Sequence, residues 1–209
     1  MKLTSSSFSE GQRIPGDFSF CAPDPAHHVC QGKKLNPQLA WSDFPPGTQS
    51  FALICHDPDV PSQGDDVNQE GRTVPASLPR VDFFHWVLID LPASLTAIAP
   101  GEFSSTVTPR GKPGTIAAHG ARQGINSYTD WFAGDHDMAG DYYGYDGPCP
   151  PWNDENIHRY VFTIYALDIA TLPLEGRFGG PEARQAIAGH ILDHASLSGT
   201  YCLNPALTA

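Results

Sequence analysis

The alternation of apolar and polar positions predicts a protein built mainly of β-strands. Four segments are apolar and rich in β-branched or aromatic residues, as strands usually are. They are residues 38–44, 50–55, 83–92 and 158–167. The segment 50–55, SFALIC, is apolar on both of its faces, which indicates a central strand covered on both sides. Between these segments, clusters of glycine, proline and polar residues predict turns and loops.

One helix is expected near the C-terminus. Pro181 and Glu182 suit the first turn of a helix, where a missing N–H and a negative charge are both favourable. Ala183, Ile187 and Ile191 then recur at helical spacing. The pattern predicts a helix that continues to about Leu197.

Length and turn content predict one β-rich domain. The chain has 209 residues, including 20 glycines and 20 prolines, which favours strands joined by structured turns. Within the single domain 1–209, residues 1–34 are expected to form an irregular N-terminal arm. Residues 62–80 are polar and lack periodicity, so they predict a long loop, and such loops are often functional or mobile.

Charge and cysteine content limit the classes of partner. The net charge is −11 with twelve Lys and Arg, which argues against nucleic acid and leaves peripheral membrane contact at most. No apolar run reaches the ~20 residues of a membrane helix or resembles a signal peptide, so a cytoplasmic location is expected. In that compartment the five cysteines should be reduced and mostly buried, although a Cys21–Cys30 bridge stays open.

Candidate chemistry gathers at the ends of the predicted strands. His158 and Tyr160 share one face at the start of their strand, beside a proline-rich loop that contains Gly147. His85 lies within the apolar segment 83–92, where a histidine is usually bonded to backbone. Asp57 follows the strand 50–55 on the same side as its apolar residues. It is either an Asx-type turn residue before proline or a carboxylate delivered to a cleft.

Three kinds of site compete for these residues. A metal site is unsupported, because the spacings match no zinc motif. Acid–base catalysis has histidine and aspartate, but no serine or cysteine lies in a nucleophile motif. An anion pocket would use the imidazoles, the phenol and loop N–H groups.

Four motifs carry a resemblance to a known family. They are DPDVP (57–61), FFHWVLIDLP (83–92), GYDGPCPP (144–151) and HRYVFTIYAL (158–167). Together they resemble the phosphatidylethanolamine-binding protein family, and most of all its bacterial Raf-kinase-inhibitor-like branch. The likeness spans roughly residues 35–202 with the order of motifs preserved. Each motif alone is weak, but in register they are specific.

The resemblance implies an antiparallel Greek-key β-sandwich with a few peripheral helices. It also implies a non-enzymatic protein without cofactor, metal or catalytic residues, whose shallow pocket binds a small anion such as phosphate, a phosphoethanolamine head group or acetate. Members of this branch tend to pair, so a homodimer is expected. Carried over position by position, the ligand-binding residues would be Asp57, Pro61, His85, Gly147, Pro151, His158 and Tyr160.

Two other functions stay open. Relatives restrain kinases and proteases, so the chain could inhibit such a protein target through the loops 62–80 and 130–146. A hydrolase that uses His85 and His158 as acid and base is the third alternative. If both imidazoles face a bound anion, affinity should rise as pH falls through ~6.5.

The chain departs from the family pattern at four places. Phe84 replaces a second histidine of animal members, and Cys149 stands where a glycine is frequent, which places a side chain at the pocket rim. Asn36 replaces a serine, and the loop 62–80 is longer than in short bacterial relatives. Ligand size and partner surface therefore do not transfer from the family.

Overall fold

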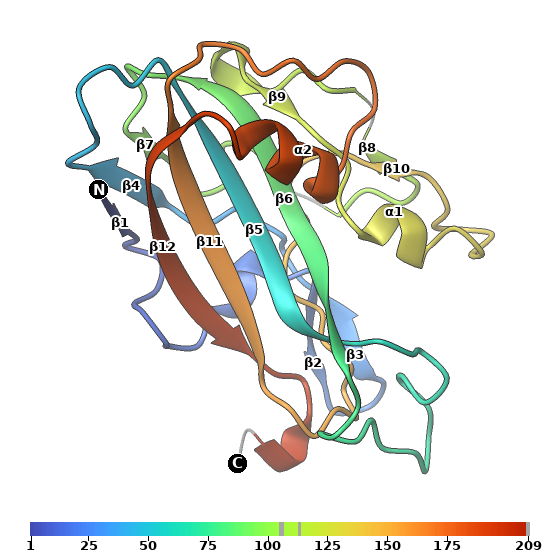
Figure 1. Cartoon of the computed structure of the whole chain (residues 1–209). Helices are drawn as coiled ribbons and strands as arrows, with labels where there is room; N and C mark the ends of the chain where they lie inside the picture. The colour runs from blue at the N-terminus through green and yellow to red at the C-terminus, as the bar shows by residue number, and fades with distance from the viewer. Residues whose placement is uncertain (105–106, 113, 208–209) are drawn as a thin grey trace.

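A five-stranded antiparallel sheet forms the frame of the structure, a computed structural model that describes residues 1–104, 107–112 and 114–207 (Figure 1). The strand order in this sheet is β12-β11-β5-β6-β9. The strands are β5 (Ser50–Pro61), β6 (Arg80–Pro92), β9 (Arg122–Gln123), β11 (His158–Leu167) and β12 (Ile191–Tyr201). Neighbouring strands in it all pair antiparallel.

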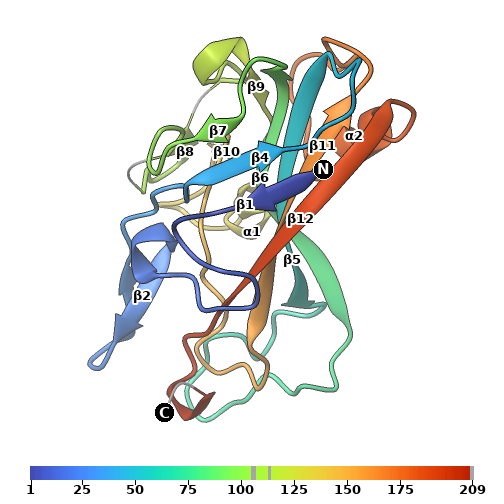
Figure 2. The same ribbon diagram turned by 90° about the vertical axis from the view of Figure 1, so that its left-hand side faces the viewer.

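A smaller sheet and a helix cover the two faces of this frame. The small sheet has the order β1-β4-β7, and Figure 2 shows it on the face opposite to α2. Its strands are β1 (Lys2–Thr4), β4 (Leu39–Ser42) and β7 (Ala97–Ile98), and α2 is Gly180–Ile187. The remaining elements are the hairpin β2 (Cys21–Asp24) and β3 (His28–Gln31), the parallel pair β8 (Gly111–Lys112) and β10 (Asp141–Tyr142), α1 (Tyr128–Trp131), and the 3-10 helices η1 (Gly16–Phe18), η2 (Ala118–Gly120) and η3 (Pro205–Leu207).

The central strand β5 divides the core in two, because its side chains alternate between the faces of the sheet. Phe51 and Leu53 pack toward the small sheet, in the same cluster as Trp41 of β4. Ala52 and Ile54 pack in the other cluster, beneath α2. The predicted mainly-β class, with antiparallel sheets and few helices, is confirmed.

Two element boundaries differ from the sequence prediction. The central strand does not end at Cys55 but continues to Pro61, with register shifts that absorb the DPDVP segment. The predicted helix ends at Ile187 rather than near Leu197, and Ile191–Tyr201 forms β12 instead. Gly189 and the serine- and threonine-rich stretch after it are poor helix formers. Pairing with the free edge of β11 therefore decides their conformation.

Residues 1–34 are not irregular throughout. They contain β1, which pairs with β4, and the β2–β3 hairpin. The predicted long loop is present as residues 62–79, between the end of β5 and the start of β6. No helix among the described residues is long and apolar enough to cross a membrane.

The Cys21–Cys30 bridge that the sequence left open is not formed. Cys21 is bonded to Cys149, and Cys30 is a free, exposed thiol. In the hairpin, Cys30 pairs with Ala22, the neighbour of Cys21, so Cys21 and Cys30 point to opposite faces. The expectation of reduced thiols is therefore also wrong for Cys21 and Cys149.

Candidate functional site

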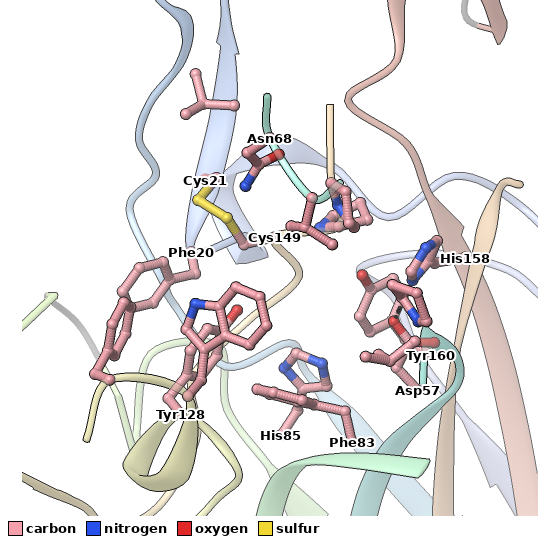
Figure 3. Close-up of a pocket in the computed structure, with 18 residues that line it drawn as sticks. Phe20, Cys21, Asp57, Asn68, Phe83, His85, Tyr128, Cys149, His158 and Tyr160 are labelled. Atoms are coloured by element: carbon pink, nitrogen blue, oxygen red, sulfur yellow. Dashed lines mark hydrogen bonds and ion pairs between the residues drawn. A yellow bond between two sulfur atoms is a disulfide. The ribbon is translucent and has the colours of Figure 1, made fainter. Parts of the chain in front are cut away.

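Six of the seven predicted site residues line one cavity of about 230 Å³. It lies at the end of the large sheet, beside the loop 62–79, helix α1 and the loop 147–151 (Figure 3). The six are Asp57, Pro61, His85, Pro151, His158 and Tyr160. Gly147 is not among the lining residues.

A chain of alternating charges begins at the cavity wall with Asp57 and His158 and continues to Asp154 and Arg80, which are not among the lining residues. His158 donates from Nδ1 to Asp57 Oδ2 at 2.7 Å and from Nε2 to Asp154 Oδ2 at 3.1 Å. Asp154 also accepts two hydrogen bonds from the Arg80 guanidinium, at 2.6 and 3.1 Å. Asp57, Asp154 and His158 are buried and Arg80 is nearly so. Because two cations alternate with two anions, the chain is neutral as a whole.

Histidine 158 is the protonated member of this chain. Burial opposes its charge, but the hydrogen bonds to Asp154 and Asp57 outweigh burial and raise the pKa of His158 to about 9. Both ring nitrogens are occupied by carboxylates. As a cation, His158 therefore holds the end of β5, through Asp57, to the loop before β11, through Asp154. The expectation that His158 titrates near ~6.5 is wrong.

Asp57 fulfils both roles that the sequence left open. Its Oδ1 accepts the backbone N–H of Asp59 at 2.7 Å, which is the Asx-type interaction, and its Oδ2 orients His158. The partner Asp154 was not singled out from the sequence, although it lies four residues before His158.

Histidine 85 is the neutral counterpart. Its Nδ1 donates to the backbone carbonyl of Asp146 at 2.7 Å, so in the neutral ring Nε2 carries the lone pair. Burial lowers the pKa of His85, against the opposing charge of Asp57 and the hydrogen bond to Asp146. The cavity thus contains one charged imidazole bonded at both nitrogens and one neutral imidazole whose Nε2 has no hydrogen-bond partner among the described residues.

Tyr160 supplies a hydrogen-bond donor. Its hydroxyl is buried and makes no well-formed hydrogen bond within the described part of the chain, and the Asp57 carboxylate lies near it. Burial, and then the charge of Asp57, raises the pKa of Tyr160, so the phenol keeps its proton. A buried hydroxyl without a partner is unfavourable, and a ligand oxygen in the cavity would relieve this.

The opposite side of the cavity is aromatic and was not predicted. Phe20, Tyr128, Trp131 and Phe132 line it, and Phe83 lies between Tyr128 and His85. Figure 3 shows Phe20 and Tyr128 on this side, near the Cys21–Cys149 disulfide. These rings come from three separate segments, so no local sequence pattern connects them. Only Phe83 had a signal, since it lies two residues before His85 on the same face of β6.

Comparison with known proteins gives the family. The model of the phosphatidylethanolamine-binding protein family matches residues 4–202. The chain belongs to this family. Members of the phosphatidylethanolamine-binding protein family are in general binding or regulatory proteins.

Individual relatives agree with this assignment over nearly their whole length. The chain is 34% identical to the UPF0098 protein of Chlamydia muridarum, over 96% of this chain and 98% of that protein. It is 28% identical to the UPF0098 protein YbhB of Escherichia coli, over 96% and 99%.

Two solved structures share the fold. They are E. coli YbcL, described as a member of the mammalian PEBP family (TM-score 0.69, 24% identity, 96% and 97% of the chains), and the Chlamydia trachomatis homologue CT736 (TM-score 0.62, 29% identity, 96% and 95%).

Gly147, which does not line the cavity, and two of the departures from the family pattern, Phe84 and Asn36, now have physical accounts. The carbonyl of Gly147 accepts a hydrogen bond from the Tyr128 hydroxyl, and a Cβ on Gly147 would lie 2.2 Å from the Phe18 carbonyl oxygen. The glycine is thus required by close backbone packing rather than by contact with the cavity. Phe84 points away from the cavity into the core beneath α2. The side chain of Asn36 is buried and bonds the backbone of residues 99–104.

The loop 62–79 contributes part of the cavity wall. Asn68 lines the cavity, and its Oδ1 accepts the backbone N–H of Trp152 at 3.0 Å. Its Nδ2 is therefore available as a donor on the cavity side (Figure 3). Asn153 holds the loop by donating to the carbonyl of Asp66 and accepting from the N–H of Asn68. In the described ranges no group of three or more His, Cys, Asp or Glu could hold a metal ion.

Proposed function

We propose that this protein is a non-enzymatic binding protein whose cavity holds the acid head group of a small ligand. The observation that carries the proposal is the buried, unpartnered hydroxyl of Tyr160 beside the free Nε2 of His85. Phosphate, a phosphoethanolamine head group and a carboxylate all present oxygens that fit this pair. The amide of Asn68 adds a third polar contact.

The charges favour a singly charged head group over a doubly charged one. The chain from Asp57 to Arg80 is internally neutral, and no lysine or arginine is among the described residues that line the cavity. A dianion would meet no uncompensated positive charge, and the net charge of the whole protein is −11. A monoanion needs only one proton between its oxygen and His85 Nε2. The neutral His85 ring can take up this proton from solvent when the anion binds.

The state of His158 supports binding rather than acid–base catalysis. A catalytic acid or base works best with a pKa near the operating pH and a ring nitrogen directed at the substrate. The pKa of His158 is raised to about 9, and both of its nitrogens bond carboxylates. Its role in the proposal is to fix Asp57 and the floor of the cavity.

Replacing Tyr160 by phenylalanine is expected to weaken binding of phosphoethanolamine by about tenfold to a hundredfold, the range for a hydrogen bond to a charged group. The fold should be weakened little, since the hydroxyl makes no well-formed hydrogen bond and only approaches the Asp57 carboxylate. Isothermal titration calorimetry measures the affinity. Tyr165→Phe is the matched control, because Tyr165 lies on the same strand and packs with the cluster beneath α2.

Two results would contradict this prediction. If the unmodified protein gives no heat with phosphoethanolamine, inorganic phosphate or acetate, the head-group proposal fails. If Tyr160→Phe binds as tightly as Tyr165→Phe, the head group does not sit at the phenol.

Affinity for acetate is expected to fall as pH rises, by up to about tenfold per pH unit. In the free protein burial lowers the pKa of His85 below its usual ~6.5, so the ring is neutral at pH 7. A bound carboxylate favours the protonated ring, so binding takes up a proton between the free-state pKa and the raised bound-state pKa. Below the free-state pKa the affinity levels off.

The titratable groups that face His85 are Asp57, Asp146, His158, Tyr128 and Tyr160. The pKa of His158 is raised to about 9 and burial raises the pKa of both tyrosines, so these three groups keep their protons over roughly pH 5 to 8. Acetate itself titrates lower, as a glutamate does near ~4.3. Calorimetry in two buffers of different ionisation enthalpy measures the proton uptake, and His85→Gln should abolish it. A flat profile in the unmodified protein would show that Tyr160 and backbone donors hold the anion without His85.

A further inference from the structure

The cavity has two chemically different sides that face each other. Figure 3 shows Asp57, His158 and Tyr160 on one side and Phe20 and Tyr128 on the other. The first side offers hydrogen bonds and paired charges, whereas the second offers ring faces and edges. A ligand that satisfied only the polar side would leave the aromatic side in contact with water.

The rings of the aromatic side form a continuous, preorganised wall. Phe20 stacks on Tyr128 at 4.7 Å between ring centroids, and Phe83 meets Tyr128 edge-on at 5.0 Å. Phe83 also contacts His85 at 5.0 Å, and His85 meets Tyr160 edge-on at 5.1 Å. The wall thus runs without a break from the aromatic side to the head-group residues. An additional flat ring could pack against it in the same offset or edge-on geometries.

The wall is also held rigidly. The Tyr128 hydroxyl donates to the Gly147 carbonyl at 2.9 Å, and the backbone N–H groups of Phe20 and Cys21 both bond the Pro148 carbonyl. The Cys21–Cys149 disulfide joins the same two segments covalently. Because these bonds fix the aromatic side chains in place, the cavity keeps its volume when no ligand is bound.

The cavity is larger than a simple anion requires. A water molecule takes up about 30 Å³ in the liquid, so the four heavy atoms of acetate occupy on the order of 100 Å³. The cavity measures about 230 Å³. The remaining space is comparable to one six-membered ring.

We infer that the ligand is a small acid with a flat aromatic body, whose head group binds Tyr160 and His85 while its ring packs between Phe83, Tyr128 and Trp131. This inference rests on the proposed function and names the ligand class of the same site. Trp131 stands at the mouth, where 49% of its surface is exposed.

Three carboxylates separate the contribution of the head group from that of the ring. Acetate has only a methyl group, cyclohexanecarboxylate has a saturated ring, and benzoate has an aromatic ring. Benzoate is expected to bind at least about tenfold tighter than acetate, given the apolar area a ring buries and the added ring–ring contacts. Cyclohexanecarboxylate should bind more weakly than benzoate, because it lacks the aromatic geometry. NMR titration at pH 6 to 7 measures all three, since weak affinities are accessible to it.

A variant at the mouth tests where the ring lies. Trp131→Ala should weaken benzoate severalfold and leave acetate unchanged, because the head-group residues are untouched. The control is Ile116→Ala, which removes an exposed apolar side chain (85% exposed) that does not line the cavity. It should leave both affinities unchanged. Since Trp131 is half-exposed, its loss should not unfold the protein.

The outcomes distinguish this inference from the proposed function. If acetate and benzoate bind equally, the aromatic-body inference is overturned and the head-group site stands. Equal binding of benzoate and cyclohexanecarboxylate would show an apolar body without a preference for a ring, and would also overturn it. An unchanged benzoate affinity in Trp131→Ala would place the ring elsewhere. If none of the three acids binds, both proposals fail together.

Discussion

Replacing Lys34 by methionine is expected to destabilise the fold by about 3–5 kcal/mol, the usual result of removing one partner of a buried ion pair. Lys34 Nζ lies 2.8 Å from Asp146 Oδ1, and neither side chain is exposed. Without the ammonium, the Asp146 carboxylate would stay buried with only the Asn126 amide as a side-chain donor. Urea unfolding followed by circular dichroism measures the loss.

A neighbouring lysine provides the control. Lys33 is 69% exposed and pairs with Asp17 at the surface, so Lys33→Met should change the unfolding free energy by no more than about 0.5 kcal/mol. The double variant Lys34→Met, Asp146→Asn should regain part of the stability, because the buried carboxylate is removed together with its ammonium partner, while Lys112 loses the attraction of Asp146. If Lys34→Met is as stable as Lys33→Met, the pair is not buried in solution as it is in the structure.

The double variant Cys21→Ser, Cys149→Ser is expected to lose about 2–5 kcal/mol of stability. The bond joins residues 128 positions apart, and cross-links over long loops restrict the unfolded chain most. Cys30→Ser should have little effect, because Cys30 is exposed and free. Thiol titration of the denatured, unreduced protein should find three of the five cysteines reactive.

The result that would contradict the bond is five reactive thiols in protein purified without reductant. In that case the double variant should be as stable as the unmodified chain. Formation of such a bond depends on the redox state of the compartment, so the titration also tests the cytoplasmic location expected from the sequence.

The sequence predicts those parts of the site that lie on strongly patterned strands. Alternation from Phe51 through Leu53 places Asp57 on the buried side, and the structure confirms this placement. His85 and His158 follow in the same way, because each lies on a long apolar strand. Period-two alternation states which face a side chain takes, and the pairing of the strands then brings those faces together.

The parts that escaped prediction depend on contacts between distant segments. The aromatic wall and the disulfide join residues from loops, and loop geometry is not encoded in a local period. The Cys21–Cys30 hypothesis failed because closeness in sequence does not place two side chains on one face. The start of strand β12 was predicted as helix because Ile191 continues the helical spacing of Ala183 and Ile187. Ala183 and Ile187 do lie in α2, but Ile191 is the first residue of β12, so its spacing is a coincidence.

The Cys21–Cys149 bond also determines how the chain is connected around the cavity. It makes residues 21–149 a closed covalent ring, to which residues 150–209 are attached as a tail. Asp57 and Arg80 belong to the ring, whereas His158 and Asp154 belong to the tail. The bonds from His158 to Asp57 and from Asp154 to Arg80 therefore attach the tail non-covalently to two separate strands of the ring. A single backbone break in the loop 62–79 would open the ring but release no fragment while the bond remains.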